Sequence, residues 1–330
     1  MDWQTGEDMT IQADRTGVVT PDGVRLHVET SGSADAPVTV VLAHGWTCST
    51  RSWHHQLEGL PRVLGSSAVR VVAYDHRGHG RSDAAPAGTT RIEQLADDLV
   101  TVLDEVVGDG PVVYAGHSMG GMTLMALADR HPELFGSRIA GAALVSTSCG
   151  QISSRAFGLP ARFDGAAAVV APRAMNLAGE RIERRALRRA TRESEAAVRA
   201  QRAAWVELAS TRLRRPAVRQ LVFGKKADPA EVDILMADLA HTPGRSFSGF
   251  FEAITRHELG HAMKALEGIP VEIMHGTRDR LLPPRHGNRM AHELPSARLW
   301  MYPGAGHMLM QERPRDVTQR LASLVRRTAA

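Results

Sequence analysis

The chain of 330 residues is long enough to bury a sizeable core, and its 43% hydrophobic and 23% charged residues are ordinary values for a globular protein. Its formal net charge is +4, and three lysines leave 37 arginines among the 40 basic residues. These arginines run through the whole chain, whereas a nucleic-acid surface would be a local basic patch. We therefore expect no nucleic-acid partner.

We expect neither a secretory signal nor a membrane-spanning segment. Its first residues lack the basic segment and the apolar segment of a secretory signal, and no apolar run is long enough to span a membrane. Cys48 and Cys149 are too few for a disulfide scaffold, which favours a reduced, cytoplasmic setting. Whether these two cysteines interact, and the oligomeric state, are left open.

Strand and helix patterns alternate over the first 150 residues. Residues 17–30 have alternating polarity around a Pro21-Asp22-Gly23 turn, which predicts a hairpin. Continuous apolar runs at 38–43 and 69–74 predict strands of a parallel sheet that is covered on both faces. Helices are predicted at 52–64 and 91–107, and a further strand at 139–145.

The stretch at 112–121, VVYAGHSMGG, is the most informative part of the sequence. A buried strand of β-branched and aromatic residues leads into Gly116-His117-Ser118-Met119-Gly120, which fits G-x-S-x-G, and a helical pattern follows. This order of strand, sharp turn, serine and helix is typical of a nucleophile elbow, in which small residues let strand and helix approach closely. We therefore expect Ser118 to be a nucleophile rather than a surface serine.

The alternation stops between about Gln151 and His257, where Ala- and Arg-rich helical sequence is interrupted by prolines. It resumes with a strand at 271–274, a helix near 286–293, a strand at 298–302 and a helix near 314–327. This arrangement predicts an α/β sheet with an inserted helical subdomain. The expected division is a core segment at 1–150, a helical cap at 151–257 and a second core segment at 258–330.

Two later strand ends supply partners for the serine. A serine hydroxyl needs a histidine to accept its proton and a carboxylate to orient that histidine. Asp279 comes just after the strand at 271–274, and His307 comes just after the strand at 298–302. The chain order Ser, Asp, His is the one that this type of elbow requires.

These motifs together resemble the α/β-hydrolase fold superfamily, in the branch with a serine nucleophile and a helical cap. The resemblance covers roughly Val18 to Gly150 and Ile269 to the C-terminus, and it leaves the cap unassigned. It is carried by His44-Gly45, the segment DHRGHGRS at 75–82, the GHSMGG elbow, HGTRD around Asp279 and PGAGH around His307. The implied fold is a mostly parallel, doubly wound sheet with an inserted α-helical cap.

The resemblance also implies a role for each matching residue. Ser118 is the expected nucleophile, His307 the general base and then acid, and Asp279 the orienting carboxylate. The backbone N–H groups of Trp46 and Met119 are expected to form the oxyanion hole. His44, Gly45, Gly116 and Gly120 are expected to support the site, with His44 bracing its loop.

Two other chemistries are disfavoured. Haloalkane dehalogenases and soluble epoxide hydrolases share this fold but use an aspartate nucleophile, and position 118 is a serine. The sequence His257-Glu258-Leu259-Gly260-His261 matches the zinc-protease pattern H-E-x-x-H. Lys264 and Glu267 occupy the positions where the longer form of that pattern has glycine and histidine, so we expect a helix returning from the cap to the core and no metal.

Several features of the predicted cap are open to more than one interpretation. Its arginines could bind an anionic lipid or a CoA phosphate, but a solvated helix face is the simpler interpretation. Its aromatic residues are expected in the cap core or the pocket lining rather than in a membrane wedge, and some could face Ser118 and set specificity. The residues concerned are Arg181, Arg184, Arg185, Arg188, Arg189, Arg192, Trp205, Phe247, Phe250 and Phe251.

The sequence therefore predicts a serine hydrolase that acts on an ester or related acyl bond of a small, moderately apolar molecule, without a cofactor. The same triad could instead serve C–C bond hydrolysis, acyl transfer or cyclisation in a biosynthetic pathway. A hydrolase-fold receptor that keeps the triad is a third alternative. The substrate itself is not predicted, because the cap shapes the pocket.

Overall fold

The computed structural model describes residues 14–152 and 214–328. Its centre is an eight-stranded sheet in the order β1-β2-β4-β3-β5-β6-β7-β8. The strands β1 and β2 form an antiparallel hairpin, β2 pairs antiparallel with β4, and every other neighbouring pair is parallel, which confirms the mostly parallel sheet. The strands are β1 Asp14–Val19, β2 Arg25–Gly32, β3 Thr39–Ala43, β4 Arg70–Tyr74, β5 Val112–His117, β6 Ile139–Val145, β7 Val271–Gly276 and β8 Arg298–Tyr302.

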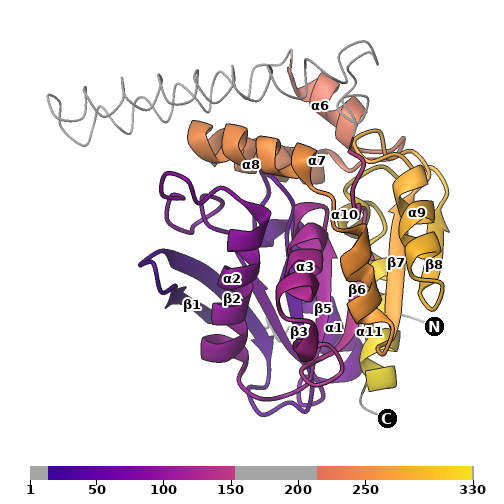
Figure 1. The fold of residues 1–330 in the computed structure, drawn as a ribbon. Helices are drawn as coiled ribbons and strands as arrows, with labels where there is room; N and C mark the ends of the chain where they lie inside the picture. Colours follow the sequence, from indigo (N-terminus) through magenta and orange to yellow (C-terminus); the bar gives the residue numbers. More distant parts are fainter. Residues whose placement is uncertain (1–13, 153–213, 329–330) are drawn as a thin grey trace, which may run out of the picture.

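The central strands are buried on both faces because helices cover each side of the sheet (Figure 1). Alternate residues of β3 illustrate this, since Val41 packs into one apolar cluster and Val40 and Leu42 into the other. The first cluster includes residues of α2 (Ile92–Val102), α3 (Met119–Arg130) and α9 (Arg285–Glu293). The second includes residues of α1 (His54–Leu64) and α11 (Pro314–Thr328), so the sheet is doubly wound.

Three described helices connect β6 to β7 and lie together across one end of the sheet, at the top of the view in Figure 1. They are α6 Arg214–Val222, α7 Pro229–His241 and α8 Gly244–Arg256. They belong to the described part of the predicted cap. The remaining part, with Arg181, Arg184, Arg185, Arg188, Arg189, Arg192 and Trp205, lies outside the described residues, and the predicted domain limits stay a prediction.

Short helical segments account for most differences from the predicted elements. The helix predicted at 91–107 is α-helical only to Val102 and continues as a π-helical segment, Leu103–Val107. Residues Thr50–Trp53, Pro132–Leu134 and Gly260–Leu266 form 3₁₀ helices, and Leu309–Glu312 forms the single turn α10. Such short pieces have too few residues to show a helical period in the sequence.

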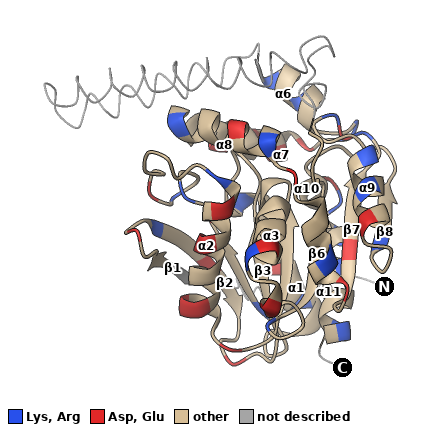
Figure 2. Cartoon of the chain, viewed as in Figure 1, with Lys and Arg blue, Asp and Glu red and all other residues tan. Residues whose placement is uncertain are grey.

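Charged residues of both signs occupy the same helices, as Figure 2 shows for α8 and α9. This mixture agrees with the small net charge of the chain. In the part of the chain that the structure describes, no helix combines the length and the apolar character that a membrane crossing requires.

Candidate active site

Ser118 lies at the turn between β5 and α3 in a strained backbone conformation. Its φ of 51° and ψ of −114° fall in a region that non-glycine residues rarely adopt. Hydrogen bonds fix the peptide groups on both sides: the Ser118 N–H donates to the Val145 carbonyl over 2.9 Å, and the Thr147 hydroxyl donates to the Ser118 carbonyl over 2.6 Å. The neighbouring strand β6 and the loop after it therefore hold the turn in place.

Three glycines let the elements around Ser118 approach one another. A Cβ atom on Gly116 would lie 2.5 Å from the Gly120 backbone, and one on Gly120 would collide with the Ala43 carbonyl oxygen at the end of β3. A Cβ on Gly45 would lie 2.8 Å from the His117 ring and 3.2 Å from the Ser118 Cβ. The loop after β3 therefore packs directly against the serine, and a methyl group at any of the three positions would push these elements apart.

His307 and Asp279 come together at the ends of β8 and β7. The His307 Nδ1 atom lies 2.7 Å from Asp279 Oδ2, and the other carboxylate oxygen accepts the Leu282 N–H over 2.8 Å. Both side chains are buried. A carboxylate oxygen accepts hydrogen bonds, so we assign the proton of the neutral imidazole to His307 Nδ1. This leaves a lone pair on Nε2.

The backbone of His307 is anchored on both sides. Its N–H donates to the Val222 carbonyl at the end of α6 over 2.7 Å, and its carbonyl lies 3.0 Å from His117 Nε2. The rings of His307 and His117 are 4.8 Å apart. Since His117 directly precedes Ser118, the structure brings the predicted Ser118, Asp279 and His307 to one edge of the sheet.

No hydrogen bond from Ser118 Oγ to His307 Nε2 occurs among the bonds of the described residues. Such bonds are often long before a substrate binds. Burial lowers the pKa of His117 well below its usual value, so this ring stays neutral and can donate from Nε2 to the His307 carbonyl.

His44 and Gly45 form a rigid loop beside the serine. The His44 Nε2 atom accepts the His76 N–H over 3.0 Å, so Nδ1 carries the proton and donates to the Gly45 carbonyl over 2.7 Å. Burial lowers the pKa of His44 to about 4, which keeps the ring neutral. These contacts occupy both ring nitrogens, as expected for a residue that holds the loop rather than reacts.

The family of the protein follows from a match along most of the chain. The sequence pattern that defines the alpha/beta hydrolase fold family matches residues 38–314, which span β3 to the start of α11. The chain belongs to the alpha/beta hydrolase fold family. This confirms the resemblance drawn from the sequence motifs.

Relatives with assigned activities match a smaller part of the chain. A bifunctional esterase/perhydrolase of Acinetobacter calcoaceticus is 36% identical over 129 residues, 39% of this chain and 43% of the relative. Epoxide hydrolase A of Mycobacterium tuberculosis is 36% identical over 130 residues, 39% of this chain and 37% of the relative. The chain thus matches less than half the length of each of these two hydrolases.

Solved structures of similar fold match over almost the whole chain. A thermophilic esterase from Thermogutta terrifontis has a TM-score of 0.71 at 21% identity and covers 96% of this chain and 100% of its own. The enol-lactonase from Burkholderia xenovorans LB400 has a TM-score of 0.68 at 24% identity and covers 94% of this chain and 100% of its own. At these identities the likeness establishes the alpha/beta hydrolase fold alone.

Ion pairs hold the loop DHRGHGRS at 75–82, a motif for which the sequence predicted no role. The Arg77 side chain is fully buried and donates to both carboxylate oxygens of Asp98, at 2.5 and 2.7 Å, and to both of Asp22, at 2.7 and 2.9 Å. These hydrogen bonds hold the pKa of Asp22 near 2. Arg77 thereby ties the loop after β4 to the hairpin turn and to α2.

Helix α8 meets the predicted oxyanion loop through aromatic residues. The Trp46 indole N–H donates to the Phe247 carbonyl over 3.0 Å, and its ring lies 4.5 Å from the Phe247 ring and 5.4 Å from the Phe251 ring. Phe250 is fully buried with its ring 5.2 Å from that of His79. These aromatic residues of the predicted cap therefore pack on the loops that follow β3 and β4. A direct role beside Ser118 stays a hypothesis.

The expectation that H-E-x-x-H lies on a helix is wrong. Helix α8 ends at Arg256, and the next helical segment begins only at Gly260. His257 is buried, whereas His261 lies on the surface 2.7 Å from Asp129, and Glu258 receives hydrogen bonds from Arg289 and the Gln151 N–H. The break in the helix removes the shared face that two zinc-binding histidines would need.

Cys48 and Cys149 are both free and buried. They belong to different apolar clusters, on opposite faces of the sheet. Burial raises the pKa of Cys48 to about 12 and that of Cys149 to about 11, so both thiols are poor nucleophiles at neutral pH.

A cavity of about 590 Å³ lies between α6 and the loop after β7, and basic residues dominate its lining. None of the predicted catalytic residues lines it, although Arg278 and Arg280 flank Asp279 in the sequence. Its charge would attract anions to the side of the site that carries Asp279. The lining residues are Arg215, Pro216, Arg219, Gln220, Phe223, Gly224, Lys225, Arg278 and Arg280.

Proposed function

We propose that this protein is a serine hydrolase that cleaves an ester or related acyl bond of a small, moderately apolar molecule through an acyl-Ser118 intermediate. The observation that carries the proposal is the 2.7 Å contact between His307 Nδ1 and Asp279 Oδ2, beside a serine in a strained turn. Strain of this kind persists only where the surrounding structure enforces it, and it is concentrated at active sites.

In this mechanism His307 acts first as a base. Its Nε2 atom accepts the Ser118 proton while Oγ attacks the acyl carbon, and Asp279 stabilises the resulting imidazolium. His307 then donates that proton to the leaving alkoxide, which departs as an alcohol. Water, deprotonated by the same nitrogen, attacks the acyl-Ser118 ester and releases the carboxylic acid and the free serine.

The backbone N–H groups of Trp46 and Met119 are proposed to stabilise the tetrahedral oxyanion. Within residues 14–152 and 214–328, neither of these two backbone N–H groups donates a hydrogen bond to a backbone or side-chain acceptor. Met119 is the first residue of α3, so its N–H has no partner within the helix and lies at the positive end of the helix dipole. In this arrangement Gly45, Gly116 and Gly120 provide the close packing, and His44 braces the Trp46 loop.

The serine at position 118 supports acyl transfer over alkyl transfer. The similarity to a hydrolase named as an esterase and to another named as an epoxide hydrolase leaves both chemistries open within the family. A serine can form an acyl-enzyme that water resolves. An epoxide-opening relative of the kind considered above would instead use an aspartate, which this chain does not have at position 118.

Two tests address the nucleophile. A fluorophosphonate probe should label the wild-type protein at Ser118 in about 1:1 stoichiometry, because such probes react with activated serines. Ser118→Ala should lose the labelling and reduce turnover of a short-chain chromogenic ester by about 10⁴-fold or more. The exposed Ser137→Ala is the matched control and should keep both properties. Turnover by Ser118→Ala within tenfold of wild type would contradict the proposal.

The alternatives that share the triad differ in their products. Hydrolysis in H₂¹⁸O places one labelled oxygen in the released acid, whereas acyl transfer or cyclisation releases a product without it. Hydrolysis of a C–C bond would be revealed by a diketone substrate that outperforms matched esters. A ligand receptor would show single turnover. The cytoplasmic location, the absence of a cofactor and the domain limits given above stay predictions.

A further inference from the structure

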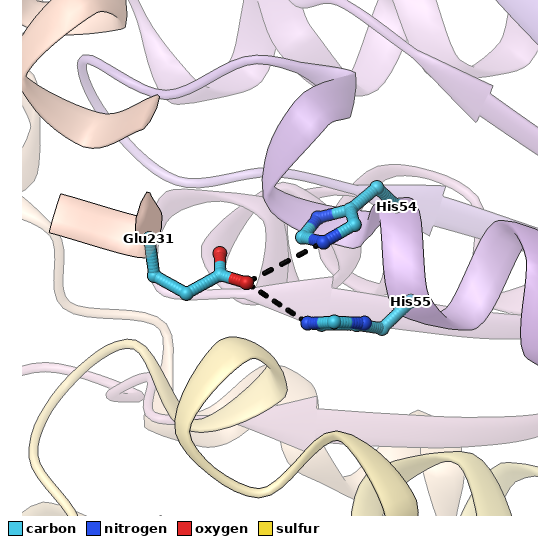
Figure 3. A group of neighbouring side chains, drawn as sticks. All are labelled: His54, His55 and Glu231. Atoms are coloured by element: carbon cyan, nitrogen blue, oxygen red, sulfur yellow. Dashed lines mark hydrogen bonds and ion pairs between the residues drawn. The ribbon is translucent and has the colours of Figure 1, made fainter. Parts of the chain in front are cut away.

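Two histidines and a glutamate from distant parts of the chain meet outside the proposed active site (Figure 3). His54 and His55 are the first residues of α1, and Glu231 lies in the first turn of α7. The Nε2 atoms of both imidazoles point at the same carboxylate oxygen of Glu231, at 3.4 Å for His54 and 2.9 Å for His55. None of the three residues belongs to the proposed triad.

Glu231 is buried but lacks a permanent positive partner. Its residue exposure is 6%, and its second carboxylate oxygen, Oε2, is buried without a hydrogen bond. In the described ranges its ion pairs are those with the two histidines, and no lysine or arginine forms an ion pair with it. A buried carboxylate is costly unless a cation compensates it, so this position calls for a positive charge.

The hydrogen bond on the far side of His54 sharpens this conclusion. His54 Nδ1 lies 2.8 Å from the Arg51 carbonyl, which can only accept, so Nδ1 carries a proton. A neutral His54 ring then presents the lone pair of Nε2 to the Glu231 oxygen, and two acceptors face each other at 3.4 Å. A cation between them removes this conflict, and a backbone carbonyl on the other ring nitrogen is the usual support of a metal-binding histidine.

We propose that His54, His55 and Glu231 bind one Zn²⁺ ion that links α1 to α7. Two imidazoles and a carboxylate are ligands that zinc prefers, and bond lengths of about 2.0–2.2 Å place tetrahedral ligand atoms roughly 3.4 Å apart. All three ligand atoms here lie within 4.8 Å of one another, so small side-chain movements would complete the geometry. The histidine side chains are 34% and 36% exposed, which gives the ion access from solvent and leaves a position for water.

The ion would strengthen a junction that already holds α7 against the core. Next to the histidines, the Ser49 hydroxyl donates to Asp238 Oδ2 over 2.7 Å, and Arg51 pairs with Asp238 Oδ1 at 3.3 Å. A zinc ion at Glu231 adds a second, coordinate link about two turns earlier in the same helix. The metal site is therefore structural, and its test does not depend on the proposed hydrolase activity.

The test measures metal binding to the full-length protein after treatment with a chelator. Equilibrium dialysis against Zn²⁺ at neutral pH should give about one ion per chain, and Zn²⁺ should raise the thermal unfolding midpoint. Co²⁺ in the same site should give the visible absorption of a tetrahedral complex. The variants His55→Ala and Glu231→Gln should each weaken binding by more than about tenfold and lose the thermal shift.

His261→Ala is the matched control, because it removes a surface histidine that also contacts a carboxylate but lies elsewhere. It should bind Zn²⁺ as the wild type does. His55→Ala changes a partly exposed side chain and keeps the test valid if Glu231→Gln fails to fold. Failure of the wild type to bind Zn²⁺, or equal binding by the wild type and the folded His55→Ala variant, would overturn the proposal.

Discussion

The two sides of the proposed active site are held in place by different means. On the nucleophile side, glycines at 45, 116 and 120 bring the ends of β3 and β5 and the start of α3 into close contact around Ser118. On the histidine side, His307 is held by hydrogen bonds to groups from other elements, including the Val222 carbonyl of α6. The position of the serine is thus a property of the sheet, whereas that of the histidine also depends on a helix inserted between β6 and β7.

A carboxylate makes the connection between α6 and the histidine loop. Glu312 accepts the Gly224 N–H over 2.8 Å and the Gly306 N–H over 2.9 Å, so one side chain joins the end of α6 to the residue before His307. The comparison predicts that damage on the nucleophile side reduces stability first. Damage on the histidine side should reduce activity while the fold persists.

The largest effect is expected for Asp279→Asn. The amide can no longer hold His307 in the tautomer with its proton on Nδ1, so kcat should fall by about 10³–10⁴-fold while the fold is kept. Initial rates with a chromogenic ester and the far-ultraviolet circular dichroism spectrum measure the two properties. Asp129→Asn, at a surface carboxylate that also contacts a histidine, should keep full activity. An Asp279→Asn enzyme within tenfold of wild type would remove Asp279 from the mechanism.

Gly120→Ala should break the nucleophile side through stability. The added Cβ would collide with the Ala43 carbonyl group and would lie 2.9 Å from the His44 carbonyl oxygen. We expect a loss at the upper end of about 1–3 kcal/mol in the free energy of unfolding, measured by urea titration. Gly110→Ala, where a Cβ meets nothing within 4 Å, is the control. Equal stabilities of the two variants would show that the crowding does not fix the elbow.

Glu312→Gln should separate activity from stability on the histidine side. Glutamine offers only one accepting oxygen for the two backbone N–H groups, so the His307 loop loses one anchor while the packing of the sheet is unchanged. The expected result is a kcat reduced about tenfold with little change in KM. The exposed Glu58→Gln serves as the control. A lower stability with an unchanged kcat would mean that this hydrogen bond does not help to position the His307 imidazole.

The smallest effect concerns pH. Burial lowers the pKa of His44, in the loop after β3, and that of His286, in α9, to about 4. The unfolded chain binds these protons near pH 6.5, so the stabilisation is present above that pH and is lost as the pH falls towards 4. His286→Gln should reduce the loss of unfolding free energy between pH 7 and pH 5 by at most about 2 kcal/mol. His261→Gln, at the surface, should leave the loss unchanged, and an unchanged loss in His286→Gln would contradict this account.

The sequence predicted the elements whose physical signature is local. Apolar β-branched runs identified the central strands, and the G-x-S-x-G turn, Asp279 and His307 were found at strand ends. The helix predicted for H-E-x-x-H was wrong because the chain leaves the helical conformation at His257. Residues 257–259 contain no glycine or proline that would have marked the end of a helix. The contacts of the His307 backbone with Val222 and His117 could not be predicted, since 85 or more residues separate the partners. The group of His54, His55 and Glu231 could not be predicted either, because only packing brings the glutamate to the two histidines.

The strained residues of this protein are concentrated in one place. The four non-glycine residues with positive φ within the described ranges are Thr47, Ser118, Ser146 and Gln151, and all follow the carboxyl ends of β3, β5 or β6. Each such conformation costs of order 1–3 kcal/mol, so the edge that carries the serine is less stable than a relaxed version of the same fold would be. Directed evolution for heat resistance alone would therefore favour glycine or asparagine at these positions, and at Ser118 the same change would end catalysis. Selection for thermostability should accordingly be paired with a screen for activity.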